Sequence, residues 1–239
     1  NCYDAEATEV IIKIYDEDGK KIIIGDNGHG MTFDEINNNF LIIGRNRRKE
    51  EGSQKSKNKL RNVIGRKGLG KLSFFGVADH IRIETIQDYQ RTVFEMDWNT
   101  ISNLRQKNEM RYYPELIEKS KNVQQKQGTE VILSGIKRKT SFYPEQIATS
   151  LSKYFDIFDE DDFSVNIIYN NDKNNKIRVT NDLKYKNISI FYNWDCPSDI
   201  PAELKNKYSQ LKNITGRLIS SEDTIPSDMR GIALFSRGK

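Results

Sequence analysis

Cysteine and long apolar runs are both scarce in this chain. The two cysteines, Cys2 and Cys196, stand far apart and form no metal-type cluster, so we expect two unpaired thiols in a reducing compartment. No run approaches the roughly 18 apolar residues that a membrane span needs, and the first residues carry no signal-peptide pattern. These absences argue against a membrane protein and predict a cytoplasmic location.

The remaining composition is polar but compatible with folded domains. Hydrophobic residues make up 36% and charged residues 30% of the 239 positions, yet apolar strand-like and helix-like stretches recur, so wholesale disorder is not expected. The length suits one large or two small domains. The chain begins at Asn1 inside a helix-like segment and ends inside a strand-like one, so we expect it to be part of a longer protein.

Positive charge gathers in one polar segment. Residues 45–61 hold eight lysines and arginines against two glutamates, while the whole chain carries a net charge of +4, so the remainder is slightly acidic. This basic segment has no apolar periodicity and no interleaved aromatic residues. It is interpreted either as a solvated mobile loop or as a loop that closes over an anion or contacts nucleic acid.

Hydrophobic patterning predicts an α+β chain with a soft boundary near residue 140. Runs of β-branched residues predict the strands, and a capping box of Thr32 and Glu35 marks the start of one helix. Before the boundary, strands are expected at 8–16, 21–26, 81–87, 91–98 and 128–136, helices at 32–44 and after residue 70, and irregular chain at 99–127. After it, helices are expected at 143–158 and 201–213, and strands at 161–171, 176–181, 188–194, 214–221 and 230–239.

Two glycine clusters flank the basic segment, DNGHGM at 26–31 and GRKGLG at 65–70. Glycines directly before a helix expose backbone N–H groups at its positive end, which favours binding of anions such as phosphate. The second cluster is weak evidence by itself, because a tight turn that packs on a helix would look the same. It lacks the G-x-G-x-x-G spacing of dinucleotide-binding folds, and Leu72 after Lys71 rules out a Walker A motif.

Four motifs in order are more specific than either cluster. NCYDA at 1–5, DNGHGM, GRKGLG and GTEV at 128–131 resemble the four nucleotide-binding boxes of the GHKL ATPase superfamily, which holds gyrase B, the ninety-kilodalton heat-shock chaperones, histidine kinases and MutL. The resemblance covers residues 1 to about 135, and the chain looks most like prokaryotic MORC-like and chaperone-like ATP-binding proteins. It implies a Bergerat ATP-binding fold at 1–140, a two-layer α/β sandwich with a mixed sheet covered by helices, and a partial transducer-like α/β domain at 141–239.

The resemblance also implies ATP or ADP as the ligand, with Mg²⁺ as its companion ion. Asp26 would accept a hydrogen bond from the adenine amino group, Thr129 would join that network, and Asn1 would be the metal ligand. Asp4 either lines the pocket or makes a structural hydrogen bond. The implied nucleotide-binding residues are Asn1, Asp4, Asp26, Gly28, Gly30, Met31, Gly65, Lys67, Gly68, Leu69, Gly70, Lys71 and Thr129.

The catalytic base cannot be named from these residues. In the non-kinase branches of the superfamily, a glutamate one helical turn before the asparagine activates the attacking water, and that turn would precede residue 1. Glu6 and Glu9 follow the asparagine and are expected on the wrong side.

Three functions stay open at this point. The first is an ATPase whose nucleotide-driven lid closure switches a homodimer in DNA-related or defence processes, with Arg237 or Lys239 near the phosphates. The second is the catalytic domain of a histidine kinase, although such kinases usually end soon after the last box. The third is a nucleic-acid-binding module without turnover, for which the basic segment is the only support.

Overall fold

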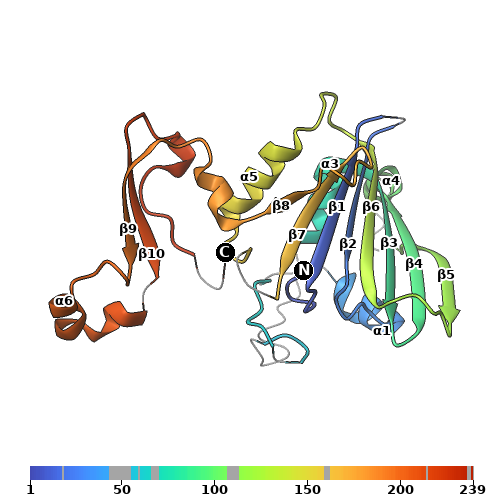
Figure 1. Cartoon of the computed structure of the whole chain (residues 1–239). Coiled ribbons are helices and arrows are strands. Elements are labelled where there is room, and N and C mark those ends of the chain that lie inside the picture. Colours follow the sequence, from blue (N-terminus) through green and yellow to red (C-terminus); the bar gives the residue numbers. More distant parts are fainter. Residues whose placement is uncertain are drawn as a thin grey trace. The chain divides into compact units, whose positions relative to one another are not determined.

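The structure is a computed structural model (Figure 1) that describes residues 1–17, 19–42, 55–58, 60–65, 70–106, 113–158, 162–213, 215–235 and 238. Contacts divide the chain into two compact units. The first comprises Asn1–Leu183 with Phe235–Lys239, and the second comprises Lys184–Leu234.

The first unit is built on a mixed sheet of eight strands. Its strands are β1 (Glu9–Tyr15), β2 (Lys21–Asp26), β3 (Ala78–Gln87), β4 (Gln90–Asp97), β5 (Glu115–Lys121), β6 (Gly128–Ile136), β7 (Ser164–Tyr169) and β8 (Ile177–Val179). They lie in the order β5-β4-β3-β6-β2-β1-β7-β8. Neighbouring strands run antiparallel except β1 and β7, which run parallel. The expected α+β class with a mixed sheet is therefore confirmed.

Helices cover one face of this sheet. They are α1 (Phe33–Glu35), a π-helix at Ile36–Phe40, a 3-10 turn at Gly70–Ser73, α3 (Phe74–Val77), α4 (Trp98–Gln106) and α5 (Pro144–Tyr154). Ala148 of α5 packs with Val10 and Ile14 of β1 in one apolar cluster. Phe75 of α3 packs with Ile83 of β3 in a second cluster, so a continuous apolar layer separates sheet from helices.

The opposite face of the sheet is charged. Successive strand residues point to opposite faces, and the residues that alternate with the core ones pair with each other. Arg91 Nε lies 2.7 Å from Glu84 Oε1, and Arg91 also pairs with Glu118. Arg82 lies 2.7 Å from Glu95. A mostly antiparallel sheet with one apolar and one charged face forms two layers rather than three.

Three segments differ from their predicted structure. Residues 99–127, expected to be irregular, contain most of α4 and all of β5. The start of the chain turns back on itself instead of forming a helix, and Glu6 there has φ +58. The helix expected at 32–44 has its capping box, but after α1 it widens into the π-helix. The three asparagines at 37–39 are weak helix formers, which fits this departure.

The division between the two units does not fall near residue 140, where a boundary was expected. Six consecutive residue pairs join β1 to β7, from Glu9↔Ser164 to Ile14↔Tyr169. The hairpin of β7 and β8 and helix α5 thus belong to the first unit. The reason is that β7 is apolar over Val165–Ile168, apart from Asn166, and these four positions are buried in the large sheet.

The second unit contains a small antiparallel pair of strands, β9 (Ile190–Cys196) and β10 (Gly216–Ser221). Helix α6 (Ala202–Lys207) and a 3-10 turn at Ser209–Asn213 stand between the two strands in sequence. The strand expected at 230–239 is not formed in the part of it that the structure describes. Across the described residues, no helix is long and apolar enough to cross a membrane.

Candidate nucleotide-binding site

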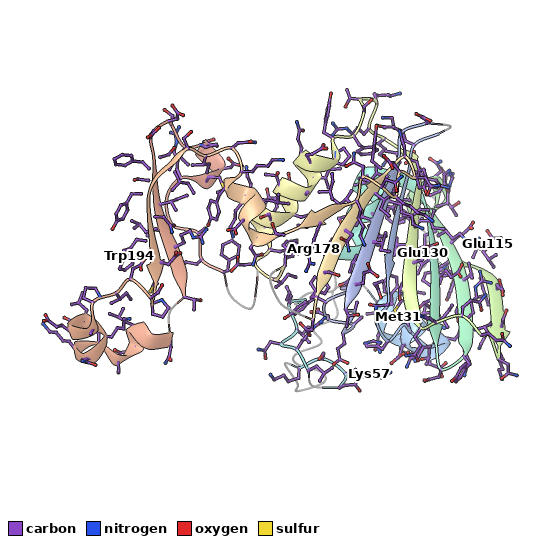
Figure 2. All side chains as sticks on the ribbon, in the orientation of Figure 1. Met31, Lys57, Glu115, Glu130, Arg178 and Trp194 are labelled. Carbon is purple, nitrogen blue, oxygen red and sulfur yellow. The ribbon has the colours of Figure 1, made fainter. Side chains whose placement is uncertain are left out.

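Pairing of three strands brings Asp26, Thr129 and Thr85 into one row. Asp26 of β2 stands opposite Thr129 of β6, which in turn stands opposite Thr85 of β3. The hydroxyl oxygens of Thr85 and Thr129 are 3.1 Å apart. The backbone N–H of Met31 donates to Thr85 Oγ1 at 2.9 Å, which places Met31 beside the row and close to α1 (Figure 2).

The row faces the helices rather than the charged side of the sheet. Because side chains alternate along a strand, Asp26 shares a face with Ile24, and Thr85 shares one with Ile83. Ile24 and Ile83 both contribute to the apolar layer under the helices. A groove of about 340 Å³ lies at the end of the same strands. Most of its lining comes from the charged face, including Lys13, Glu84 and Glu130, but Asp26 and Thr129 also line it.

The two glycines of DNGHGM lie where the loop passes the protein's own backbone. A Cβ on Gly28 would lie 2.6 Å from the carbonyl oxygen of Ala5. Gly30 has φ +66, and a Cβ there would lie 2.1 Å from the carbonyl oxygen of Ile86. These glycines are therefore needed because the loop lies close to the N-terminal turn and to β3. A close contact between the loop and the adenine base, as expected from the resemblance, stays a prediction.

Asp26 accepts a hydrogen bond from the loop that follows it. Its Oδ1 accepts the N–H of Gly28 at 2.9 Å. Burial, followed by the charge of Asp26, raises the pKa of Cys2 to about 12, so this thiol stays protonated beside the carboxylate. A carboxylate offers about four lone pairs, so Asp26 keeps acceptor capacity for a ligand amino group.

The carboxylate of Asp4 ties the first motif to the third. It accepts the backbone N–H of Ile64 at 2.8 Å and that of Gly65 at 2.9 Å. A Cβ on Gly65 would lie 2.8 Å from Asp4 Oδ2, so a larger residue here would have to displace the Asp4 carboxylate. These bonds favour the structural one of the two interpretations of Asp4.

Glu6 anchors the segment that follows the basic residues. It accepts the N–H of Asn58 at 2.9 Å and the side-chain amide of Asn58 at 2.6 Å, and it also binds the Ser56 hydroxyl. Partial burial acts in the opposite direction, but these hydrogen bonds lower the pKa of Glu6 below its ordinary value. Glu6 is thus an ionised anchor, in keeping with the view that it is not the catalytic base.

Several predicted residues cannot be assessed. Lys67, Gly68, Leu69, Arg237 and Lys239 lie outside the described residues, as do the side chain of Lys71 and most of the basic segment. Gly70 is described, and it opens the 3-10 turn before α3. Asn1 is exposed, and its carbonyl accepts the N–H of Ala5 at 2.9 Å.

Two residues near the site went unrecognised in the sequence. Cys2 looked like an ordinary thiol, although its place directly after Asn1 could have drawn attention to it. Thr85 carried no signal, because only strand pairing brings it to Thr129.

Comparison with known proteins identifies the class. Residues 1–129 match the sequence model of the family described as histidine kinase-, DNA gyrase B-, and HSP90-like ATPase. The match covers more than half of the chain, and the chain belongs to this family. It is an ATPase domain of the GHKL type, and this membership supports nucleotide binding and ATPase activity in general.

Individual relatives come from two kinds of protein. A candidate type II restriction enzyme, HgiDII of Herpetosiphon aurantiacus, is 31% identical over 188 residues, which is 78% of this chain and 29% of that protein. The chaperone protein HtpG of Francisella tularensis subsp. holarctica is 33% identical over 129 residues, 53% of this chain and 19% of the chaperone. HtpG of Fusobacterium nucleatum is 37% identical over 76 residues, 31% of this chain and 12% of the chaperone. The chain thus spans less than a third of the length of these relatives.

Proposed function

We propose that this chain binds Mg-ATP at the end of the sheet marked by Asp26, Thr129 and Met31, and that it serves as the ATP-hydrolysing head of a larger protein. One observation carries the proposal. Strand pairing sets a carboxylate beside two threonine hydroxyls on the helix-covered face, directly next to the turn that bears Asn1. The family membership gives this arrangement its chemical meaning.

The carboxylate of Asp26 would select adenine. It accepts the amino hydrogen of adenine, whereas guanine presents a carbonyl oxygen at the same edge and would repel it. The N–H of Gly28 fixes the orientation of Asp26 before any ligand arrives. Met31 supplies an apolar contact for the ring, and the Thr129 hydroxyl extends the polar network.

The phosphates would lie toward the N-terminal turn and the glycine-rich segment. Backbone N–H groups of residues 65–70 and the ammonium groups of Lys67 and Lys71 are the proposed contacts. Magnesium would neutralise charge on phosphate oxygens, and because it takes few protein ligands, the amide oxygen of Asn1 would be enough to hold it. We assign no catalytic base, because Asp4 and Glu6 are both engaged in hydrogen bonds to backbone N–H groups.

In the larger protein, nucleotide binding would close the segment around residues 45–70 over the phosphates and bring two heads together as a dimer. The second unit, Lys184–Leu234, would begin a transducer region, and Arg237 or Lys239 would reach the phosphates. The match to a candidate restriction enzyme, which covers 78% of this chain, supports a DNA-related or defence setting. The relatives described above favour an ATPase over a histidine kinase, while a closer kinship to MORC-like proteins stays a prediction.

Isothermal titration tests the pocket. A non-hydrolysable ATP analogue with Mg²⁺ should bind the wild-type protein, and the matching GTP analogue should bind far more weakly. Asp26→Asn should weaken ATP binding about tenfold to a hundredfold, which is the usual worth of a hydrogen bond to a charged group. Asp34→Asn is the matched control, because Asp34 is an exposed carboxylate in the first turn of α1.

Equal affinity of the Asp26→Asn variant and wild type would show that Asp26 does not hold the base. A wild-type protein without any affinity for ATP would reject the proposed function as a whole. Light scattering with and without the analogue tests the dimer, and the rate of phosphate release with and without duplex DNA tests the DNA-related setting.

A further inference from the structure

Arg61 ends the basic segment, where a solvated charge was one expectation. The structure instead buries this arginine, of which only 5% is exposed. A guanidinium keeps its charge at all ordinary pH values, so removing it from water is costly unless its donors are all satisfied. The contacts of Arg61 therefore need to be counted one by one.

All five N–H donors of Arg61 have acceptors. Nε donates to Asp162 Oδ2 at 3.2 Å. One terminal nitrogen donates to the carbonyl oxygens of Tyr3 at 3.2 Å and Ala7 at 2.7 Å. The other donates to the carbonyl and the carboxylate of Asp162, both at 2.8 Å. Because no donor is left over, Arg61 has no free N–H with which to bind a phosphate itself.

Two aromatic rings complete the enclosure. The guanidinium carbon lies 4.6 Å from the centre of the Tyr3 ring and 5.3 Å from that of Phe163. The two rings contact each other edge to face, with centres 5.3 Å apart. Cations over aromatic faces are attracted by the ring quadrupole, more so when they are removed from water.

Arg61 thereby joins three segments that are far apart in sequence. Tyr3 and Ala7 belong to the N-terminal turn, which also carries Asn1 and Asp4. Asp162 stands two residues before the first residue of the buried strand β7. Three residues after Arg61, the chain is bound to Asp4 through the N–H groups of Ile64 and Gly65. The first glycine of GRKGLG, Gly65, is thus tied to the turn directly by Asp4. Arg61, four residues earlier in the chain, binds the same turn through the carbonyls of Tyr3 and Ala7.

We propose that Arg61 is a positioning residue for the phosphate end of the nucleotide. It holds the turn that bears Asn1 at a set distance from the start of the glycine-rich segment, and this inference rests on the proposed function. The adenine end depends less on Arg61, because the pairing of β2, β6 and β3 sets Asp26, Thr129 and Thr85 in their row, although Ala5 of the same turn contacts the Gly28 loop. Loss of Arg61 should therefore weaken the binding of ligands with phosphates more than that of ligands without them.

Arg61→Lys is the main variant. Lysine keeps the charge, but its three donors diverge from one nitrogen and cannot reach both carbonyls and Asp162 together. Titration with the Mg²⁺ complex of a non-hydrolysable ATP analogue should show about tenfold weaker binding, equivalent to the loss of one to two net hydrogen bonds. Titration with adenosine should give an affinity within about twofold of wild type.

Two further variants keep the test decisive. Asp162→Asn removes the charge of a side chain that is 59% exposed but keeps an oxygen that can accept from Arg61, so the fold should tolerate it. Arg61 would keep its two turn carbonyls, and Mg-ATP binding should weaken only about threefold. Arg82→Lys is the control, because Arg82 pairs with Glu95 on the charged face of the sheet. Melting curves by circular dichroism check that wild type and each variant of the 239-residue chain are folded at the temperature of the titration.

The outcomes separate the inference from the function on which it rests. Selective loss of Mg-ATP affinity in folded Arg61→Lys, or in Asp162→Asn if the lysine variant does not fold, supports the positioning role. Equal loss for adenosine and Mg-ATP would mean a general structural role and would overturn the inference, as would unchanged Mg-ATP affinity. A wild-type protein that binds neither ligand would overturn the proposed function and this inference together.

Discussion

Gly30→Ala tests why the DNGHGM loop needs its second glycine. Alanine at φ +66 costs about 1–2 kcal/mol, because L-residues crowd their own backbone in the left-handed region. The new Cβ would also lie 2.1 Å from the carbonyl oxygen and 2.7 Å from the carbonyl carbon of Ile86, a residue of β3. Overpacking of this kind costs about 1–3 kcal/mol. The free energy of unfolding should therefore fall by about 2–5 kcal/mol, a large share of the 5–15 kcal/mol of a typical domain.

Three other glycines separate the two contributions. Gly19 has φ +86 but no described atom within 4 Å of its Cβ position, so alanine there should cost about 1–2 kcal/mol from conformation alone. Gly28 has no positive φ but would meet the Ala5 carbonyl, so its cost should be about 1–3 kcal/mol from overlap alone. Gly70 has neither problem within the described structure, and Gly70→Ala should leave stability unchanged.

Urea unfolding followed by circular dichroism measures these differences, provided that the slope of each transition stays that of wild type. The prediction requires Gly30→Ala to be at least as destabilising as Gly19→Ala and Gly28→Ala. If Gly30→Ala loses less than about 1 kcal/mol, the loop can move away from β3 and the close approach is not a constraint.

Two predictions follow from shifted pKa values. The lowered pKa of Glu6 means that its stabilising hydrogen bonds with Ser56 and Asn58 are complete above the ordinary glutamate pKa and are lost as pH falls through the lowered value. Glu6→Gln should therefore flatten the fall in melting temperature below pH about 4.5, and parallel curves for variant and wild type would contradict this. Because the pKa of Cys2 rises from 9.0 to about 12, iodoacetamide at pH 8 should modify it roughly a thousandfold more slowly in the native protein than in urea. Equal rates by mass spectrometry would mean that burial and the charge of Asp26 do not keep the native thiol protonated.

Local signals in the sequence were reliable where neighbouring residues decide the structure. The hairpin of β1 and β2, with its turn at Gly19, and the capping box of Thr32 and Glu35 were all predicted from a few adjacent positions. The order of the four motifs predicted the family, since each motif is a short run of residues. The segment 99–127 failed because its polar composition hides the periodicity of α4 and β5.

Contacts between distant segments were beyond prediction. A single sequence holds no signal that Arg61 would meet Asp162, and its place at the end of a charged run suggested a solvated loop. The parallel pairing of β1 with β7 was likewise missed, which put the boundary near residue 140 instead of after Leu183. The Arg61–Asp162 pair and the β1–β7 pairing were missed for the same reason. The composition of a segment does not reveal which distant segment it will pair with.

The sequence alone determined the class of this protein, because short motifs with fixed internal spacing carry that information. Only the tertiary structure decided what the residues of these motifs touch. Gly28 and Gly30 pack against the protein's own backbone, and Asp4 accepts hydrogen bonds from the start of the glycine-rich segment. Arg61 is buried and connects the N-terminal turn to Asp162. The physical reason is that hydrogen-bond satisfaction and close packing act between surfaces that meet only after the sheet has formed.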